Sequence, residues 1–132
     1  MTTVLDRCRS FGRRLYSRLL HSVFLMTRGL TVGVRAIVRS EEGKFLLVRH
    51  TYIPGWCFPG GGVERGETAE STLRKELQQE TGLNLVNRPT LYGVFFNRSV
   101  SKRDHVLVYL CDVDADEAAR GASFEIAEIG FF

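Results

Sequence analysis

The sequence predicts an α/β domain of the α+β type, with a largely antiparallel or mixed sheet preceded by an extra N-terminal amphipathic helix. Three observations predict this class. A helical apolar period fills the first 26 residues, an alternating period starts at Thr31, and a second helical segment lies between two groups of strands. A doubly wound parallel sheet would need more crossover helices than this chain offers.

Composition indicates one globular domain. The chain has 132 residues, 44% of them hydrophobic and 25% charged, and no apolar run approaches the ~20 residues that span a bilayer. Its three cysteines, Cys8, Cys57 and Cys111, form no CxxC pair. This count argues against a disulfide framework and a zinc site, so we expect reduced thiols and a cytoplasmic protein.

The positive charge is concentrated at the N-terminus. Residues 1–31 hold six arginines and one acid, a balance of +5, whereas the other 101 residues hold 12 basic and 14 acidic side chains, a balance of −2. The net charge of +3 therefore does not describe a basic surface spread over the domain. We expect no specific nucleic-acid binding.

Residues 3–26 have the pattern of a basic amphipathic helix, and Gly29 is a plausible end. Its apolar positions recur at spacings of three and four: Val4, Cys8, Phe11, Leu15, Leu19 and Val23. We expect residues 1–30 to form a segment of their own. Packing on the sheet or pairing in a homodimer is the favoured role; contact with an anionic membrane surface and a transit peptide are the alternatives.

An alternating pattern over Val32, Val34, Ala36 and Val38 predicts a strand, and residues 44–50 predict a second one. The polar turn at 40–43 between them suggests that the two strands form a hairpin. Residues 51–55 form a predicted loop, 56–58 a short strand, and the glycines at 60–62 a loop.

The clearest helix is predicted over residues 69–80. Thr68 suits its N-cap, and Gly82 lies where a C-terminal glycine is expected. Strands are predicted at 91–96 and 106–111, with a polar, basic stretch between them. An acidic turn or short helix at 112–121 and a last strand at 124–132 complete the chain.

Two glutamates on the predicted helix 69–80 point to chemistry. Glu76 and Glu80 are four residues apart and flank the apolar side that carries Leu73 and Leu77. Two like charges beside a core repel each other and resist desolvation unless they share a cation. A solvated charged face is the ordinary alternative for such a pair, but the preceding glycine run, where backbone can approach a ligand, favours a site.

The segment Gly61–Leu83 resembles the Nudix box, whose pattern is Gly, five residues, Glu, seven residues, then Arg-Glu-U-x-Glu-Glu-x-Gly-U with U aliphatic. Seven of the nine specified positions match, at the correct spacing. The resemblance extends over residues 31–132. It implies a mixed β-sheet sandwich between helices, and hydrolysis, dependent on Mg²⁺ or Mn²⁺, of a nucleoside diphosphate linked to another moiety.

The resemblance also implies roles for particular residues. Glu76 and Glu80 correspond to the catalytic metal ligands, helped by a backbone carbonyl of Gly60 or Gly61. Glu67 and Lys75 correspond to a pair of oppositely charged residues with a structural role. Gly82 and Gln79 occupy motif positions to which a structural role is also assigned. Family members often add a later carboxylate, and Glu125 is the candidate by position, ahead of Glu128. The general base is Glu76, Glu80 or Glu125.

Two positions depart from the pattern, Lys75 in place of arginine and Gln79 in place of the first paired glutamate. Lysine cannot make the bidentate contact of an arginine fork, and glutamine lacks the charge that would hold a further metal. An active enzyme with fewer metals is the favoured interpretation. A nucleotide-binding sensor with little or no catalysis is the alternative.

Candidate substrate contacts surround the box. Phe58 is one of several aromatic residues that could stack on a base, and Arg35 and Arg49 lie on strands beside the glycines. Arg98 and Arg103 lie in the basic stretch 97–103 and could reach phosphates. We expect His50 and His105 to be structural, because neither has a second histidine or cysteine at the spacing of metal ligands.

The C-terminal end is apolar, Gly130-Phe131-Phe132. Proteins of the family usually continue into a further helix, which has no counterpart in the predicted domain 31–132. Either the chain is truncated or its core is closed by association.

Overall fold

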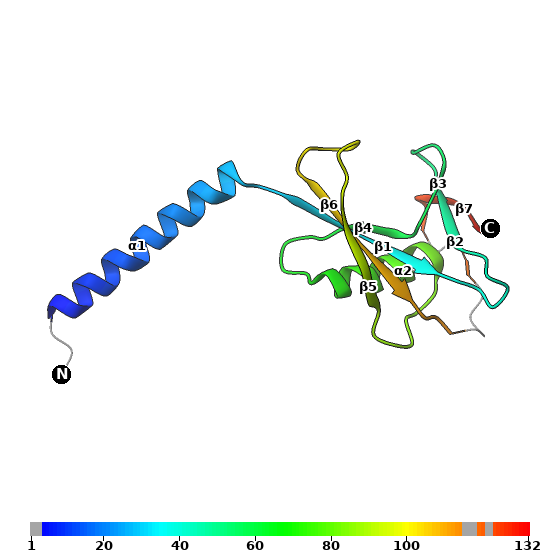
Figure 1. The fold of residues 1–132 in the computed structure, drawn as a ribbon, viewed down its shortest axis with the longest axis horizontal. Helices are drawn as coiled ribbons and strands as arrows, with labels where there is room; N and C mark the ends of the chain where they lie inside the picture. Colours follow the sequence, from blue (N-terminus) through cyan, green and yellow to red (C-terminus); the bar gives the residue numbers. More distant parts are fainter. Residues whose placement is uncertain (1–3, 115–118, 121–122) are drawn as a thin grey trace. The chain divides into compact units, whose positions relative to one another are not determined.

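A computed structural model describes residues 4–114, 119–120 and 123–132, with side chains described from residue 12 onward. The chain divides into two compact units, Met1–Leu30 and Thr31–Phe132. The first unit is the helix α1, Val4–Thr27, blue in Figure 1. Among the described residues no helix is long and apolar enough to cross a membrane.

The second unit is built on two sheets, so the predicted mixed α+β class is confirmed. One sheet has the order β4 (Gly60–Gly62), β1 (Thr31–Val38), β6 (Asp104–Cys111) and β5 (Thr90–Phe96). The other has the order β3 (Trp56–Cys57), β2 (Leu46–His50) and β7 (Ile126–Phe131). Only β1 and β6 pair in parallel; the other pairs are antiparallel.

The predicted hairpin between the first two strands is wrong. The turn forms as expected, with the Ser40 amide donating to the Lys44 carbonyl, but only one isolated bridge, Arg39 to Phe45, joins the two segments. Beyond it β1 and β2 belong to different sheets. Each strand finds a better partner far away in sequence, β1 in β6 and β2 in β7.

The glycine run is a short strand, not a loop. In β4, Gly61 pairs with Val34 and Gly60 with Arg35, antiparallel to β1. A Cβ on Gly60 would lie 1.9 Å from the Val34 carbonyl oxygen. Glycine is therefore required because the two backbones approach more closely than a side chain allows.

The helix α2 spans Ala69–Thr81 and has both predicted caps. The Thr68 side chain accepts from the Ser71 amide and the Ser71 hydroxyl accepts from the Thr68 amide, while Gly82 adopts the left-handed conformation with φ 72°. The helix packs on β1 and β4, burying Leu73 and Leu77. The core that this forms contains Val34, Ala36, Val38, Leu46, Leu73, Leu77, Leu83 and Cys111.

The remaining strands form close to the predicted positions. β5 begins one residue earlier than expected, β6 begins at Asp104 and β7 at Ile126. The turn or helix predicted at 112–121 falls partly outside the described residues. Within the second unit, Figure 1 shows α2 on one face of the long β1–β6 pair, which places the helix beside β4.

Candidate active site

Glu80 is a buried carboxylate on the inner side of α2. Its side chain is 8% exposed, and its Oε2 accepts a hydrogen bond of 2.9 Å from the Gly60 amide. Burial raises the pKa of Glu80 to about 7; the Gly60 amide opposes this rise and the neighbouring charge of Glu76 adds to it. In the metal-free protein this carboxyl therefore keeps its proton to a higher pH than an ordinary glutamate does.

Glu76 lies one helical turn earlier, against β4. Its side chain is 20% exposed, and burial raises its pKa. A Cβ built on Gly61 would lie 2.6 Å from the Glu76 carboxyl carbon, so this carboxylate rests directly on the Gly61 backbone. The Lys75 Nζ lies 3.8 Å from Glu76 Oε1 and opposes the rise in pKa.

The two glycines face different ways. At the ends of the β1–β4 ladder, the Ala36 amide donates to Pro59 and the Val63 amide donates to Val32. Since antiparallel pairs alternate, the ladder directs the polar groups of Gly61 toward β1 and those of Gly60 away from it. The Gly60 amide accordingly reaches Glu80. Gly60 is therefore the better candidate for a backbone ligand than Gly61.

Glu67 and Lys75 form an ion pair beside the site. The Lys75 Nζ donates to Glu67 Oε1 at 2.6 Å, and the Thr72 hydroxyl donates to Glu67 Oε2 at 2.7 Å. The Lys75 ammonium holds the pKa of Glu67 below its usual range. The pair ties the loop before α2 to the helix that carries both glutamates.

Two further predicted residues lie within electrostatic reach of the pair. The charge of Glu125 raises the pKa of Glu76 and Glu80, after the larger effect of burial, and Arg35 on β1 lowers both. The Glu125 carbonyl accepts from the Thr51 amide, which fastens this residue to the end of β2. Glu128 instead forms an ion pair of 2.6 Å with Arg49.

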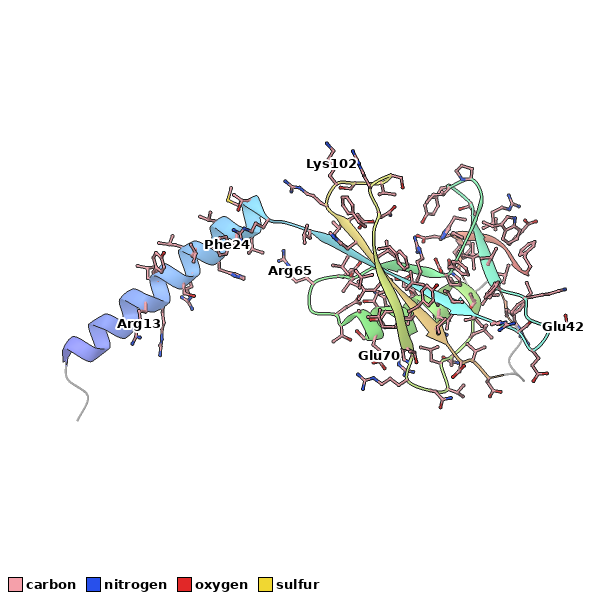
Figure 2. All side chains as sticks on the ribbon, viewed as in Figure 1. Arg13, Phe24, Glu42, Arg65, Glu70 and Lys102 are labelled. Atoms are coloured by element: carbon pink, nitrogen blue, oxygen red, sulfur yellow. The ribbon has the colours of Figure 1, made fainter. Side chains whose placement is uncertain are left out.

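Other predicted residues are not brought to the carboxylates by a contact that the structure describes. Arg49 is held by Glu128, Phe58 packs edge-on against Phe45 at 6.3 Å between ring centroids, and Gln79 is exposed. The exposed Arg98 and Arg103 belong to the turn between β5 and β6. Figure 2 shows Lys102 of the same turn pointing outward.

One neighbour of Glu80 was assigned only a structural role by the sequence. The His50 Nε2 lies 3.5 Å from Glu80 Oε1, and the Tyr52 ring lies 5.4 Å from the imidazole, centroid to centroid. A lone histidine without ligand spacing gives no functional signal. The only clue in the sequence is its place at the end of a predicted strand, ten residues before the first of the glycines.

The donors at this site fit a hard divalent cation. Glu76, Glu80 and Gly60 offer oxygen atoms, and the raised pKa of both glutamates reports an unfavourable pair of buried negative charges that a cation would relieve. Within the described part of the chain no group of three or more His, Cys, Asp or Glu side chains gathers at metal-holding distance. Backbone oxygen, water and substrate would complete the coordination.

An open groove of about 790 Å³ lies elsewhere in the second unit. It is lined by the turn after β1 and by Leu83, Cys111 and Ile129, and none of the predicted site residues contributes to it. We place the candidate site at the carboxylates, because the buried pair Glu76 and Glu80 meets the glycine backbone there and the groove contains none of these groups.

Comparison with known proteins adds an independent observation. The family model described as NUDIX domain matches residues 29–132. An ADP-ribose pyrophosphatase of Methanocaldococcus jannaschii is 32% identical over 127 residues, covering 89% of this chain and 74% of that protein. An RNA pyrophosphohydrolase of Coxiella burnetii is 31% identical over 68 residues, covering 51% of this chain and 30% of that protein.

Solved structures share the fold. The crystal structure of a MutT NUDIX hydrolase from Burkholderia pseudomallei superposes with a TM-score of 0.66 at 26% identity, over 77% of this chain and 81% of that one. A MutT protein from Methanosarcina mazei gives the same TM-score at 24% identity, over 77% and 75% of the two chains. Some curated relatives, such as the Coxiella protein, are matched over only about a third of their length.

Proposed function

The chain belongs to the NUDIX domain family, and from that premise we propose that it hydrolyses the phosphoanhydride bond of a nucleoside diphosphate linked to another moiety. The observation that supports this most directly is the pair of buried carboxylates, Glu76 and Glu80, set against the backbone of β4. Burying two acids side by side is unfavourable without a cation to share. A diphosphate is the substrate class that brings a divalent cation and needs one for cleavage.

In the proposed reaction, water attacks one phosphorus of the diphosphate. A new P–O bond forms to the water oxygen, the bond from that phosphorus to the bridging oxygen breaks, and the bridging oxygen leaves on the other phosphate. A carboxylate accepts the proton of the attacking water. Glu76, Glu80 and Glu125 are the candidates for this carboxylate.

The remaining residues bind and orient. The Arg35 guanidinium lies within electrostatic reach of both glutamates and presents a fork of N–H donors, so it suits a phosphate oxygen. Lys75 and Glu67 fix the start of α2, and the Gly60 amide fixes Glu80. A Mg²⁺ or Mn²⁺ ion held by Glu76, Glu80, the Gly60 carbonyl and, through water, Glu125 would supply Lewis acidity toward the diphosphate.

The exposed Gln79 bears on how many metals the site holds. Glutamine keeps a neutral acceptor oxygen but lacks the charge of the family's glutamate, so we propose a reduced metal count. Reverting Gln79→Glu should raise the turnover rate and the affinity for a second Mn²⁺. If the turnover rate and the Mn²⁺ stoichiometry of this variant equal those of the wild type, Gln79 does not contribute to the metal site, and the sensor alternative remains open.

The central experiment is a hydrolysis panel with and without Mg²⁺ or Mn²⁺. ADP-ribose and 5′-triphosphorylated RNA are included because two relatives are named for ADP-ribose and for RNA, and nucleoside triphosphates and dinucleoside polyphosphates extend the range of phosphoanhydrides. We expect turnover of at least one compound that depends on the metal. Glu76→Gln and Glu80→Gln should each lower it by about 10²–10³-fold, the usual effect of removing one charge-stabilising group.

Glu70→Gln is the matched control, because Glu70 lies on the same helix but pairs with Arg74 on the outer side. Its activity should stay within about twofold of wild type, as for other surface substitutions. If nucleotides bind tightly while no compound in the panel is cleaved, the protein is a sensor. If Glu80→Gln is as active as Glu70→Gln, the site lies elsewhere.

For α1 we propose association rather than catalysis. Packing or homodimer formation remains the favoured role, and its basic, acid-poor composition keeps an anionic membrane surface as the alternative. Light scattering of the full chain, together with flotation on anionic and zwitterionic vesicles, separates these roles. A cytoplasmic location is proposed on the reduced cysteines alone.

A further inference from the structure

We propose that His50 is a positioning residue for Glu80, and that its Nε2–H holds one carboxylate oxygen while the Gly60 amide holds the other. The inference rests on the proposed function and assigns a role within the same site. In this proposal His50, at the end of β2, orients a carboxylate in addition to filling space in the fold.

The contacts around the Glu80 carboxylate divide between two donors. Gly60 N–H donates to Oε2 at 2.9 Å, and His50 Nε2 lies 3.5 Å from Oε1. The His50 side chain is 10% exposed, so little water competes for the carboxylate on that side. With one donor facing each oxygen, the carboxylate cannot rotate about its last bond without losing a contact.

Strand alternation delivers the imidazole to this place, because successive side chains of β2 point to opposite faces of the sheet. Along β2, Arg49 pairs with Glu128 and His50 pairs with Ile126. The residue skipped between these two pairs, Ala127, lies on β7, so the alternation along β2 is kept. The Arg49 side chain goes to the Glu128 carboxylate, whereas His50 goes to Glu80.

The surroundings of His50 Nδ1 indicate that the ring proton is on Nε2. Among the described side chains, His50 Nδ1 is buried and has no hydrogen-bonding partner in the protein. A proton on Nδ1 would be a buried, unpaired donor, whereas a proton on Nε2 faces a carboxylate. A proton on Nε2 is therefore favoured over a proton on Nδ1, and the Tyr52 ring, packed against the imidazole, limits its rotation.

The two glutamates are thus held by separate sets of groups. Glu76 has Lys75 at 3.8 Å and rests on Gly61, whereas Glu80 has Gly60 and His50. Groups that orient a ligand from behind typically change metal affinity or activity by about 10–100-fold when they are removed. We expect His50 to act through Glu80 and not through the substrate.

Three substitutions in the full chain test this assignment. His50→Gln places an amide donor near the former Nε2, His50→Asn reaches only the former Nδ1 position, and His50→Leu keeps bulk without a donor. We expect Mn²⁺ affinity, measured by titration calorimetry, to fall about 10–100-fold in the Asn and Leu variants. His50→Gln should stay within about threefold of wild type, and kcat should follow metal affinity while KM stays constant.

The chain offers a matched control in His105. This residue also has a buried Nδ1 without a partner, but its ring lies against Phe96 at 5.3 Å between centroids and no described contact joins it to Glu80. The same three substitutions there should change thermal stability without changing Mn²⁺ affinity. A purely structural His50 would behave like His105, and that result would overturn the proposal.

A spectroscopic measurement separates this proposal from the proposed function. In the ¹⁵N-labelled, metal-free chain, long-range proton–nitrogen correlation should show Nε2 of His50 protonated, and Glu80→Gln should shift that nitrogen more than Nδ1. A proton on Nδ1 would overturn the role of His50 even if the enzyme is active. Metal binding and a correct tautomer without turnover would support His50 while the hydrolase assignment fails.

Discussion

The two helices of this protein use charge in opposite ways. In α1 every residue from 12 to 27 is exposed, including Arg13, Arg14 and Arg18, so those charges remain in water. In α2 the glutamates at 76 and 80 are largely desolvated, and the pKa of both is raised. The longer helix carries more charged residues. Only in the shorter helix are charged groups buried, and their desolvation lowers the stability of the fold.

This difference shows that burial, not the number of charged residues, marks a site. The arginines of α1 need no explanation beyond a polar helix face, because a solvated charge has almost no free-energy cost. The glutamates of α2 do need one. The two helices should therefore differ in their contributions to stability, to pH dependence and to activity.

The largest expected difference is in packing. Leu77→Ala removes a fully buried side chain of α2 and should lower the free energy of unfolding by about 2–5 kcal/mol. Arg13→Ala in α1, where the side chain is exposed and lies off the apolar side of the helix, should change it by less than about 0.5 kcal/mol. Urea unfolding followed by circular dichroism measures both. Equal losses would mean that α1 is buried in solution.

The next difference is in pH dependence. The pKa of Glu80 is about 7 in the folded protein and near 4.5 in the unfolded chain, so the folded state binds this proton more tightly. Stability of the metal-free protein is therefore highest below pH 4.5 with respect to this group and falls as pH rises to 7. Glu76 acts in the same direction. The part of this loss that Glu80 contributes should be about 3 kcal/mol.

Urea unfolding in a chelator at pH 5, 6, 7 and 8 tests this slope. Glu80→Gln should flatten it, because glutamine does not titrate, and should stabilise the metal-free protein at pH 8. Saturating Mg²⁺ should restore stability to the wild type at that pH. If the unfolding free energy of Glu80→Gln depended on pH as steeply as that of the wild type, the titrating group would not be Glu80.

A smaller difference in free energy separates two neighbouring glycines. Gly61→Ala would place a methyl group 2.6 Å from the Glu76 carboxyl carbon and should lower the hydrolytic rate about 100-fold by displacing that carboxylate. At Gly62 a Cβ meets nothing within 4 Å, so Gly62→Ala should stay within about threefold. If both variants were equally active, Glu76 would not act from its observed position.

The smallest effect is at the helix cap. Thr68→Ala removes the side-chain acceptor of the Ser71 amide and should lower the stability of the domain by about 1 kcal/mol. Thr68→Ser, which keeps the hydroxyl, is the control and should be nearly neutral. Thermal unfolding distinguishes them. An unchanged melting temperature in Thr68→Ala would show that packing alone fixes the start of α2.

Local signals predicted α2 and its glutamates well. The 3.6-residue period, Thr68 and Gly82 define the helix from neighbouring residues alone, and the same period puts Glu76 and Glu80 on one side. The Nudix-like spacing added the glycines and the Glu67–Lys75 pair. These features depend on residues fewer than 25 positions apart, so the sequence displays them directly.

Non-local pairing was not predictable in the same way. The turn at 40–43 looks like a hairpin turn, but the partners of β1 and β2 are chosen by burial against segments that lie far along the chain. The role of His50 was missed for the same reason. Its contact with Glu80 joins two elements, β2 and α2, and residues 30 positions apart, which no local pattern indicates.

The parallel pairing of β1 with β6 also governs when the domain can form. Thr31 meets Asp104, 73 residues further along the chain. At a synthesis rate of about 5–20 residues per second, β1 leaves the ribosome about 4–15 s before its central neighbour exists. During that interval the valines and the isoleucine of β1 are exposed and its backbone is unpaired. Slow translation and a high concentration of nascent chains should therefore favour aggregation over formation of the native sheet.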